Sequence, residues 1–250
     1  MDLNLQLLVD ILEDFERLRS GDTQNWEKVA DCSLEKYNVK IWRTSSSRTD
    51  THKYIYKLLG VFKDVSLDLF SHFYGDLETR KSWDTRTRSI DVLGKVDAIS
   101  LDSEHSTSEG QLIRWQIPVG WMFSDRVYIF TRYKVYFRGA HFFVDVQHPK
   151  VDDPALTKGA VAVKDYNAVT LFTGEGDSVL MYQNFVTAFD LQMSLPSWFI
   201  NWATGLGLRD LISSFKTNYF IYSKNLEKQG QGDSNSDADS SEANNANQNK

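Results

Sequence analysis

Histidine and cysteine, the side chains that most often carry catalysis or hold metal ions, are few in this sequence. The five histidines are His52, His72, His105, His141 and His148. They form neither an HExxH motif nor the Cys/His spacing of a zinc site, and Cys32 lies in no motif typical of a nucleophile. The Walker, GxGxxG and GxSxG motifs are also absent from the sequence. The sequence therefore predicts neither a metal nor a cofactor, and it disfavours an enzyme.

A basic and an acidic side chain, Arg80 and Asp84, lie four residues apart in a segment predicted to be a short helix. On the surface of a helix, such a pair contributes only about 0.2–0.5 kcal/mol. The acid follows the base, however, which is the less favourable order for supporting a helix. A guanidinium group also binds phosphate through two parallel hydrogen bonds, and a buried arginine needs a counter-charge. Both a surface ion pair and an anion site fit this spacing.

Aromatic residues stand out at 13% of the 250 residues. The 7 Trp, 11 Tyr and 15 Phe provide enough ring surface to line a cavity, although aromatic residues also build ordinary cores. Trp115, Tyr128 and Tyr166 lie in three different predicted strands. Taken alone, they are most simply interpreted as core residues.

The spacing of apolar residues predicts helices and strands in the first third of the chain. Residues 3–18 carry apolar side chains at helical intervals, which predicts an amphipathic helix. Strands are expected at 39–43 and 54–56. Two short helices are expected next, one at 66–74 with Ser66 as its N-cap and one at about 77–83.

From about residue 88 to residue 190 the pattern predicts mostly strands. Residues 126–137 and 141–147 predict a hairpin. A turn is expected between one strand at 160–172 and another at 179–189. Pro196 then opens a long helix whose apolar residues Trp198, Trp202, Leu206 and Leu211 share one side. This order predicts an α+β fold in which a curled antiparallel sheet wraps around the C-terminal helix and leaves room inside.

The chain is expected to hold one domain. Residues 1–228 show no repeat and no linker rich in proline or glycine. Residues 229–250 are acidic and rich in Asn and Ser, without an aromatic or branched aliphatic residue. Such a segment cannot bury enough apolar surface to offset its ordering entropy, so it predicts a disordered tail.

Charge and cysteine content bear on the compartment and the partners. The formal net charge is −6, so no overall basic field attracts a polyphosphate and we expect no nucleic-acid partner. The single cysteine excludes an internal disulfide and suits a reducing compartment. Residues 1–14 lack the basic start of a signal peptide, and no apolar run approaches the roughly 20 residues needed to span a bilayer. We expect a cytoplasmic monomer.

Four short motifs resemble those of START lipid-transfer domains, in the same order. They are TRKSWD at 79–84, RWQIP at 114–118 followed by SDRVY at 124–128, VKDY at 163–166, and PSWFINWA at 196–203. The resemblance spans about residues 10–228 and is greatest to the phosphatidylcholine-binding branch of the family. It implies a helix-grip fold, in which a U-shaped sheet and a long C-terminal helix enclose a lipid tunnel.

The resemblance also implies roles for five residues. In the phosphatidylcholine-binding branch the arginine of the first motif holds the lipid phosphate and the aspartate pairs with it, which corresponds to Arg80 and Asp84. Three aromatic residues enclose the choline, and the matching positions are Trp115, Tyr128 and Tyr166. Ring faces suit a quaternary ammonium because it has no N–H to donate. We therefore expect a carrier of one phospholipid, with phosphatidylcholine as the cargo.

Two groups of large apolar residues are candidates for a gate that contacts the membrane. The first group is Trp121, Met122 and Phe123, and the second is Trp198, Phe199 and Trp202. Because tryptophan is favoured at the membrane interface, we expect transient peripheral contact there. The alternative is that the two groups pack on each other as a closed lid.

Other functions stay open. Ala168 and Gln183 stand where the phosphatidylcholine branch has a glutamine and an aromatic residue, so the cargo can be another lipid, such as a sterol, a ceramide or phosphatidylethanolamine. The acidic tail is also compatible with a lipid-sensing adaptor that recruits a partner. An enzyme that uses the same type of cavity is the third class, and the missing motifs disfavour it.

Overall fold

The computed structural model of the chain describes residues 3–45, 54–118, 124–187 and 208–226. The elements in chain order are α1 (Leu5–Arg19), β1 (Glu27–Leu34), β2 (Tyr37–Ser45), β3 (Tyr54–Lys63), α2 (Leu67–Gly75), α3 (Leu77–Trp83), β4 (Ser89–Val96), β5 (Gly110–Ile117), β6 (Asp125–Phe137), β7 (Ala140–Gln147), η1 (Pro149–Asp152), α4 (Pro154–Thr157), β8 (Ala160–Ala162), β9 (Tyr166–Glu175) and β10 (Ser178–Thr187). Residues 208–226 are helical and are called the C-terminal helix below.

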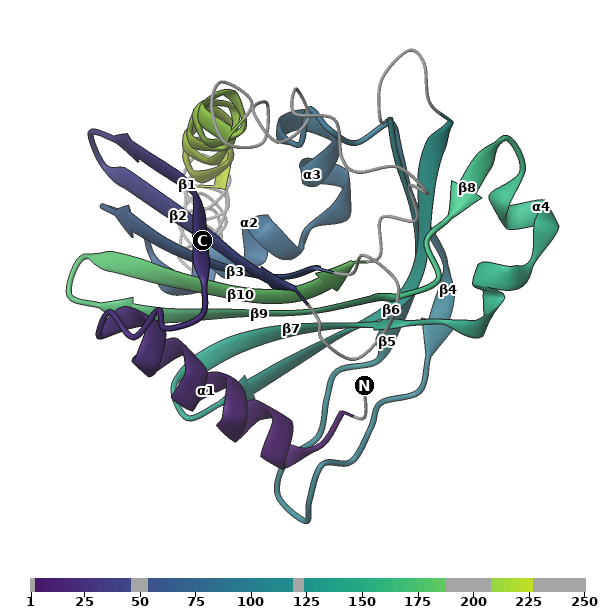
Figure 1. The fold of residues 1–250 in the computed structure, drawn as a ribbon, viewed down its shortest axis with the longest axis horizontal. Helices are drawn as coiled ribbons and strands as arrows, with labels where there is room; N and C mark the ends of the chain where they lie inside the picture. Colours follow the sequence, from purple (N-terminus) through teal and green to yellow (C-terminus); the bar gives the residue numbers. More distant parts are fainter. Residues whose placement is uncertain (1–2, 46–53, 119–123, 188–207, 227–250) are drawn as a thin grey trace, which may run out of the picture.

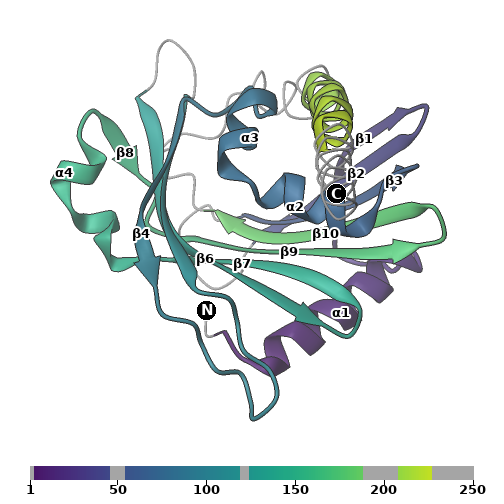
Figure 2. The ribbon, with the colours of Figure 1, turned by 180° about the vertical axis from the view of Figure 1, so that it is seen from behind.

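One curved sheet is the frame of the molecule. Nine strands pair antiparallel in the order β1-β2-β3-β10-β9-β7-β6-β5-β4, and β8 pairs in parallel with β6. The sheet curls so that α2, α3 and the C-terminal helix lie on its concave side, whereas α1 lies against its convex side (Figures 1 and 2). The predicted α+β helix-grip fold is confirmed.

The convex face of the sheet is covered by the amphipathic helix α1. Its buried residues Leu8, Ile11 and Phe15 pack against Leu171 of β9 and Tyr182 of β10. Asn4 caps the helix, since its side chain accepts a hydrogen bond from the backbone N–H of Leu7. The helical spacing of these apolar residues is what allows one face of α1 to be buried completely.

The concave face holds a second core, which joins α2 to the C-terminal helix. Phe70 and Phe73 of α2 lie 5.2 Å and 5.0 Å from the ring of Phe215, measured between ring centroids. Leu208 and Ile212 of the C-terminal helix join the same core. These contacts fix the helix above the sheet while leaving space beside it.

Alternation along β6 decides which of its side chains reach the concave face. Val127 and Ile129 pack with Val151 of η1 on the outer face. Tyr128 and Phe130 pack with Tyr166 of β9 on the inner face. The even-numbered residues from Arg126 to Arg132 therefore point toward the interior, whereas Tyr136, farther along the strand, is exposed.

Three local features differ from the sequence predictions. The single strand expected at 160–172 is wrong: residues 160–162 form β8 in parallel with β6, whereas Tyr166 begins β9, which pairs with β7 and β10. The apolar pattern does not predict β1. The side chains of this strand are only partly and irregularly buried, so its sequence lacks a clear alternation of apolar and polar residues. Ser66 precedes α2 in an extended conformation, but its side chain makes no capping hydrogen bond.

Some predictions concern residues that the structure does not describe. The helix start at Pro196, with Trp198, Trp202 and Leu206, and the tail at 229–250 lie outside the described residues. Within the described ranges, no helix is both long and apolar enough to cross a bilayer.

Candidate functional site

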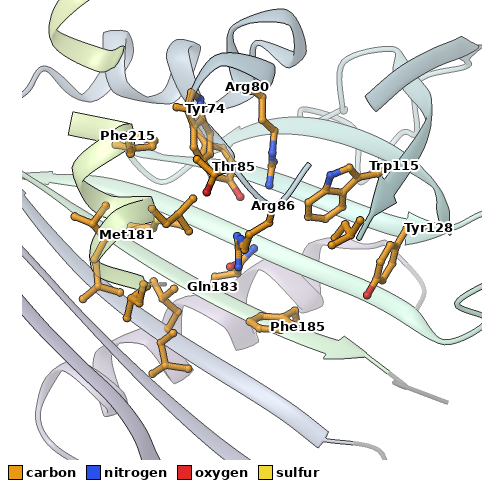
Figure 3. A pocket seen from close by; sticks show the side chains of 18 of the residues that line it. Tyr74, Arg80, Thr85, Arg86, Trp115, Tyr128, Met181, Gln183, Phe185 and Phe215 are labelled. Atoms are coloured by element: carbon orange, nitrogen blue, oxygen red, sulfur yellow. The ribbon is translucent and has the colours of Figure 1, made fainter. Parts of the chain in front are cut away.

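A cavity of about 350 Å³ lies between the concave face of the sheet, α3 and the C-terminal helix. Apolar side chains of β2, β3 and the C-terminal helix line one part of it, among them Ile41, Leu58 and Phe215. The part next to β5, β6 and α3 is lined instead by arginines and aromatic rings (Figure 3). The cavity therefore combines a long apolar region with one polar end.

Arg80 and Asp84 form a buried ion pair at this polar end. Asp76 caps the start of α3, because its carboxylate accepts hydrogen bonds from the backbone N–H groups of Glu78 and Thr79. Arg80 Nε then donates to Asp84 Oδ2 at 3.2 Å, and the two side chains are only 7% and 0% exposed. A surface ion pair is therefore excluded. The Arg80 side chain lines the cavity (Figure 3).

Arg86 is a second arginine on the same carboxylate, and the sequence analysis does not select it. Its Nε lies 3.4 Å from Asp84 Oδ1, and its backbone N–H donates to the same oxygen. Burial raises the pKa of Asp84, but the charges of Arg86 and Arg80, together with the hydrogen bonds that these two residues donate, outweigh burial and hold this pKa below its ordinary value. One carboxylate thus faces two guanidinium groups, which leaves the group of three with a net positive charge.

We expect Asp84→Asn to flatten the loss of stability in acid. The pKa of Asp84 is lower in the folded chain than in the unfolded chain, where it is about 3.9. Its carboxylate therefore stabilises the fold fully above the unfolded pKa. This stabilisation is lost as the pH falls through the folded pKa. The measurement is urea unfolding of lipid-free protein from about pH 7 to about pH 2. Glu104→Gln, at an exposed position, is the control. If the free energy of unfolding of Asp84→Asn fell with acid as steeply as that of the parent, Asp84 would not be paired with the two arginines.

The three aromatic residues selected by the resemblance lie together and face the cavity. Trp115 and Tyr128 are partners in the β5–β6 register, with ring centroids 5.6 Å apart. Tyr166 lies edge-on to Tyr128 at 5.0 Å. The guanidinium carbon of Arg80 lies 4.7 Å from the centroid of the Trp115 ring. We call these three rings the ring cluster, and it adjoins the Arg80–Asp84 pair directly.

A buried polar network lies behind the ring cluster, and the sequence motifs do not predict it. Arg132 of β6 donates to both carboxylate oxygens of Asp145, its partner in β7, at 2.7 Å and 2.8 Å. The Tyr166 hydroxyl donates to Asp145 as well, at 3.1 Å. Burial opposes the charge of Arg132, but Asp145 outweighs it and raises the pKa of Arg132. The network therefore fixes the ring of Tyr166 through Asp145.

One further arginine, Arg126, is buried in the wall of the cavity. It is 5% exposed, and its Nη1 donates to the backbone oxygen of Ser124 at 2.7 Å. Its Nε has no hydrogen-bond partner. None of the salt bridges between described residues involves Arg126, and the adjacent Asp125 pairs with Arg88. Four arginines of the described ranges line the cavity: Arg80, Arg86, Arg126 and Arg132.

A family model described as START domain matches residues 6–217 of this chain. The chain belongs to the START domain family. The phosphatidylcholine transfer protein of Bos taurus is 26% identical over 201 residues, which cover 76% of this chain and 83% of that protein. The StAR-related lipid transfer protein 7, mitochondrial, of Homo sapiens is 24% identical over 218 residues, or 83% of this chain, and the chain spans about half of that relative, 52%.

Solved structures of START proteins share the fold. Human STARD10 matches with a TM-score of 0.56 at 17% identity, over 86% of this chain and 82% of that chain. Human StAR-related lipid transfer protein 5 matches with a TM-score of 0.53 at 16% identity, over 89% of this chain and 97% of that one. This START domain is therefore a lipid-binding protein of a lipid-transfer family, with the helix-grip fold.

The predicted gate of this START domain falls on residues that the structure does not describe. Trp121, Met122, Phe123, Trp198, Phe199 and Trp202 all lie outside the described residues. The two departures from the phosphatidylcholine branch lie inside them. Gln183 lines the cavity and donates to Thr170 Oγ1 at 3.1 Å, whereas Ala168 is buried beside the ring cluster.

Proposed function

We propose that this START domain carries one phospholipid, with phosphatidylcholine as its cargo, and moves it between membranes without chemical change. The observation that carries the proposal is the contact between a buried arginine, Arg80, and the ring cluster at one end of an apolar cavity. An anion-binding group beside ring faces suits phosphocholine, whose phosphate and ammonium are joined by a single ethylene unit. The apolar remainder of the cavity suits acyl chains.

The net charge of Arg80, Arg86 and Asp84 supports the binding of a phosphodiester by the two arginines. Without ligand, Arg80 and Arg86 carry two positive charges against the single negative charge of Asp84. A phosphodiester adds one negative charge and brings the sum to zero. With Arg80 and Asp84 alone, the same ligand would leave an unpaired negative charge in a buried site, which is costly. We therefore include Arg86 in the proposed phosphate site.

Carrying a lipid has a physical cause that needs no catalytic residue. Drawing a two-chain lipid into water exposes about 30 methylene groups at about 0.8 kcal/mol each, which sums to roughly 20–25 kcal/mol. An apolar cavity replaces the bilayer around these groups and removes most of this barrier. We propose that the carrier acts in the cytoplasm and touches membranes only transiently.

Native mass spectrometry of the purified protein tests this function directly. We expect one phospholipid per chain, mainly with a choline headgroup. A chain loaded with sterol or ceramide would contradict the phospholipid cargo and leave the family unchanged.

Trp115→Leu is expected to weaken phosphatidylcholine binding by about 2-fold to 30-fold, because a desolvated cation–π contact is worth about 0.5–2 kcal/mol. Trp115→Phe keeps a ring face and loses the hydrogen bond from Trp115 Nε1 to Thr87, so it should retain most of the affinity. The measurement is the lipid bound after exchange with vesicles. Phosphatidic acid, which has no ammonium, is the control ligand. An equal loss of both lipids would show that the ring only supports the fold.

A further inference from the structure

Arg126 is a buried cation for which the protein supplies no counter-charge among the described residues. Its Nε–H is buried and unpartnered, and the side chain lines the cavity. The neighbouring carboxylate of Asp125 is bound by Gln116 and by Arg88 instead. Burying a guanidinium without an anion is unfavourable, so the arrangement points to an anionic group on the ligand.

The position of Arg126 relative to the ring cluster is set by the strand. Arg126 and Tyr128 are two residues apart on the inner face of β6, which separates their Cα atoms by about 7 Å. Their partners in β5 are Ile117 and Trp115, and all four residues line the cavity. The polar end of the cavity therefore offers three subsites, which are Arg80 with Arg86, the ring cluster, and Arg126.

The three subsites differ in the charge that they attract. The first attracts an anion, the ring cluster attracts a cation, and Arg126 attracts a second anion. A phosphocholine group fills the first two subsites, but it places a positive charge near Arg126 and leaves that arginine unpaired. A headgroup with a phosphate, an ammonium and a carboxylate supplies a partner for each subsite.

We propose that the cavity also binds phosphatidylserine, with the serine carboxylate on Arg126. The inference rests on the proposed function, because the phosphate and the ammonium take the places of phosphocholine at Arg80 and the ring cluster. The carboxylate accepts hydrogen bonds from the guanidinium, including its free Nε–H. Arg126 is then the residue that determines whether the headgroup can carry an extra negative charge.

Phosphatidylserine and phosphatidylethanolamine make a matched pair for the test, because they differ by this one carboxylate. The parent protein is incubated with vesicles that contain equal amounts of these two lipids and phosphatidylcholine, re-isolated, and analysed by mass spectrometry. We expect the parent to hold at least about tenfold more phosphatidylserine than phosphatidylethanolamine, the ratio that one charge-assisted contact supports. Analysing the re-isolated protein separates cargo from adsorption to charged vesicles.

Arg126→Gln is expected to bring the ratio of the two lipids close to one, while phosphatidylcholine and phosphatidylethanolamine stay bound. Arg126→Lys keeps the charge and should keep part of the preference. The thermal midpoint of lipid-free Arg126→Gln should equal or exceed that of the parent, since an unpaired buried charge is removed. This midpoint shows that the loss of preference does not come from misfolding.

The outcomes separate this inference from the proposed function. Binding of phosphatidylcholine without a preference for phosphatidylserine over phosphatidylethanolamine would overturn the inference alone. A preference that survives in Arg126→Gln would overturn it as well, because the carboxylate would then bind elsewhere. A parent protein that holds none of the three lipids would overturn both proposals.

Discussion

Arg80→Gln is expected to lower phosphatidylcholine affinity by about 30-fold to 1000-fold. At the proposed phosphate site, the change would remove a charge-assisted hydrogen bond to the phosphate. It would also leave Arg86 as the only arginine of the pair on Asp84. A loss of about 2–4 kcal/mol follows from removing one partner of a buried charged contact. The measurement is the transfer of fluorescent phosphatidylcholine between vesicles at matched concentrations of folded protein.

Lys81 provides a matched control for Arg80. It is the next residue of α3, it is also basic, and it pairs with Glu78 on the exposed side of the helix. Lys81→Gln therefore removes the same formal charge without touching the cavity, and transfer should stay near that of the parent. If Arg80→Gln and Lys81→Gln transfer lipid equally well, Arg80 does not hold the phosphate.

Asp145→Asn is expected to lower the free energy of unfolding by about 3–5 kcal/mol, the cost of leaving one partner of a buried ion pair unpaired. Arg132 would lose its counter-charge at a position where its side chain is 2% exposed, and Tyr166 would lose a charged acceptor. Urea unfolding of the lipid-free protein measures the change.

Two variants show whether this cost comes from the charge. Tyr166→Phe removes only the hydrogen bond to Asp145 and should cost about 0.5–1.5 kcal/mol. The double variant Arg132→Met with Asp145→Leu removes both charges and should recover most of the stability lost in Asp145→Asn. A cost below about 1 kcal/mol for Asp145→Asn would mean that water reaches Arg132 and replaces its partner.

Local patterns were sufficient to predict most of the framework. The helical spacing in α1 predicts the buried face that Leu8, Ile11 and Phe15 form, because an amphipathic helix has only one way to bury its apolar side. The hairpin of β6 and β7 follows from two apolar strands around Gly139, which adopts a positive φ of 75°. The break between β8 and β9 arises instead because the two strands pair with different neighbours in the sheet. The local pattern of apolar residues carries no information about these neighbours.

Site residues that lie in a family motif could be predicted from the sequence. Site residues that meet only through the pairing of strands could not. Arg80, Asp84 and the ring cluster come from the family resemblance, and the structure brings them together. Arg132 and Asp145 are thirteen residues apart and meet only because of the β6–β7 register. Arg126 looks like any charged residue near a strand end, and it is set apart only by its burial and by an Nε that has no hydrogen-bond partner.

A carrier must give up its cargo as readily as it takes it, and the sharing of Asp84 by two arginines has a consequence for that balance. Asp84 supplies an anion to Arg80 and Arg86 before any lipid arrives. Because Asp84 stays beside both arginines, a phosphate at the proposed site meets one net positive charge rather than two. Its electrostatic attraction to the site is correspondingly smaller, so we expect the lipid to be held moderately and released readily.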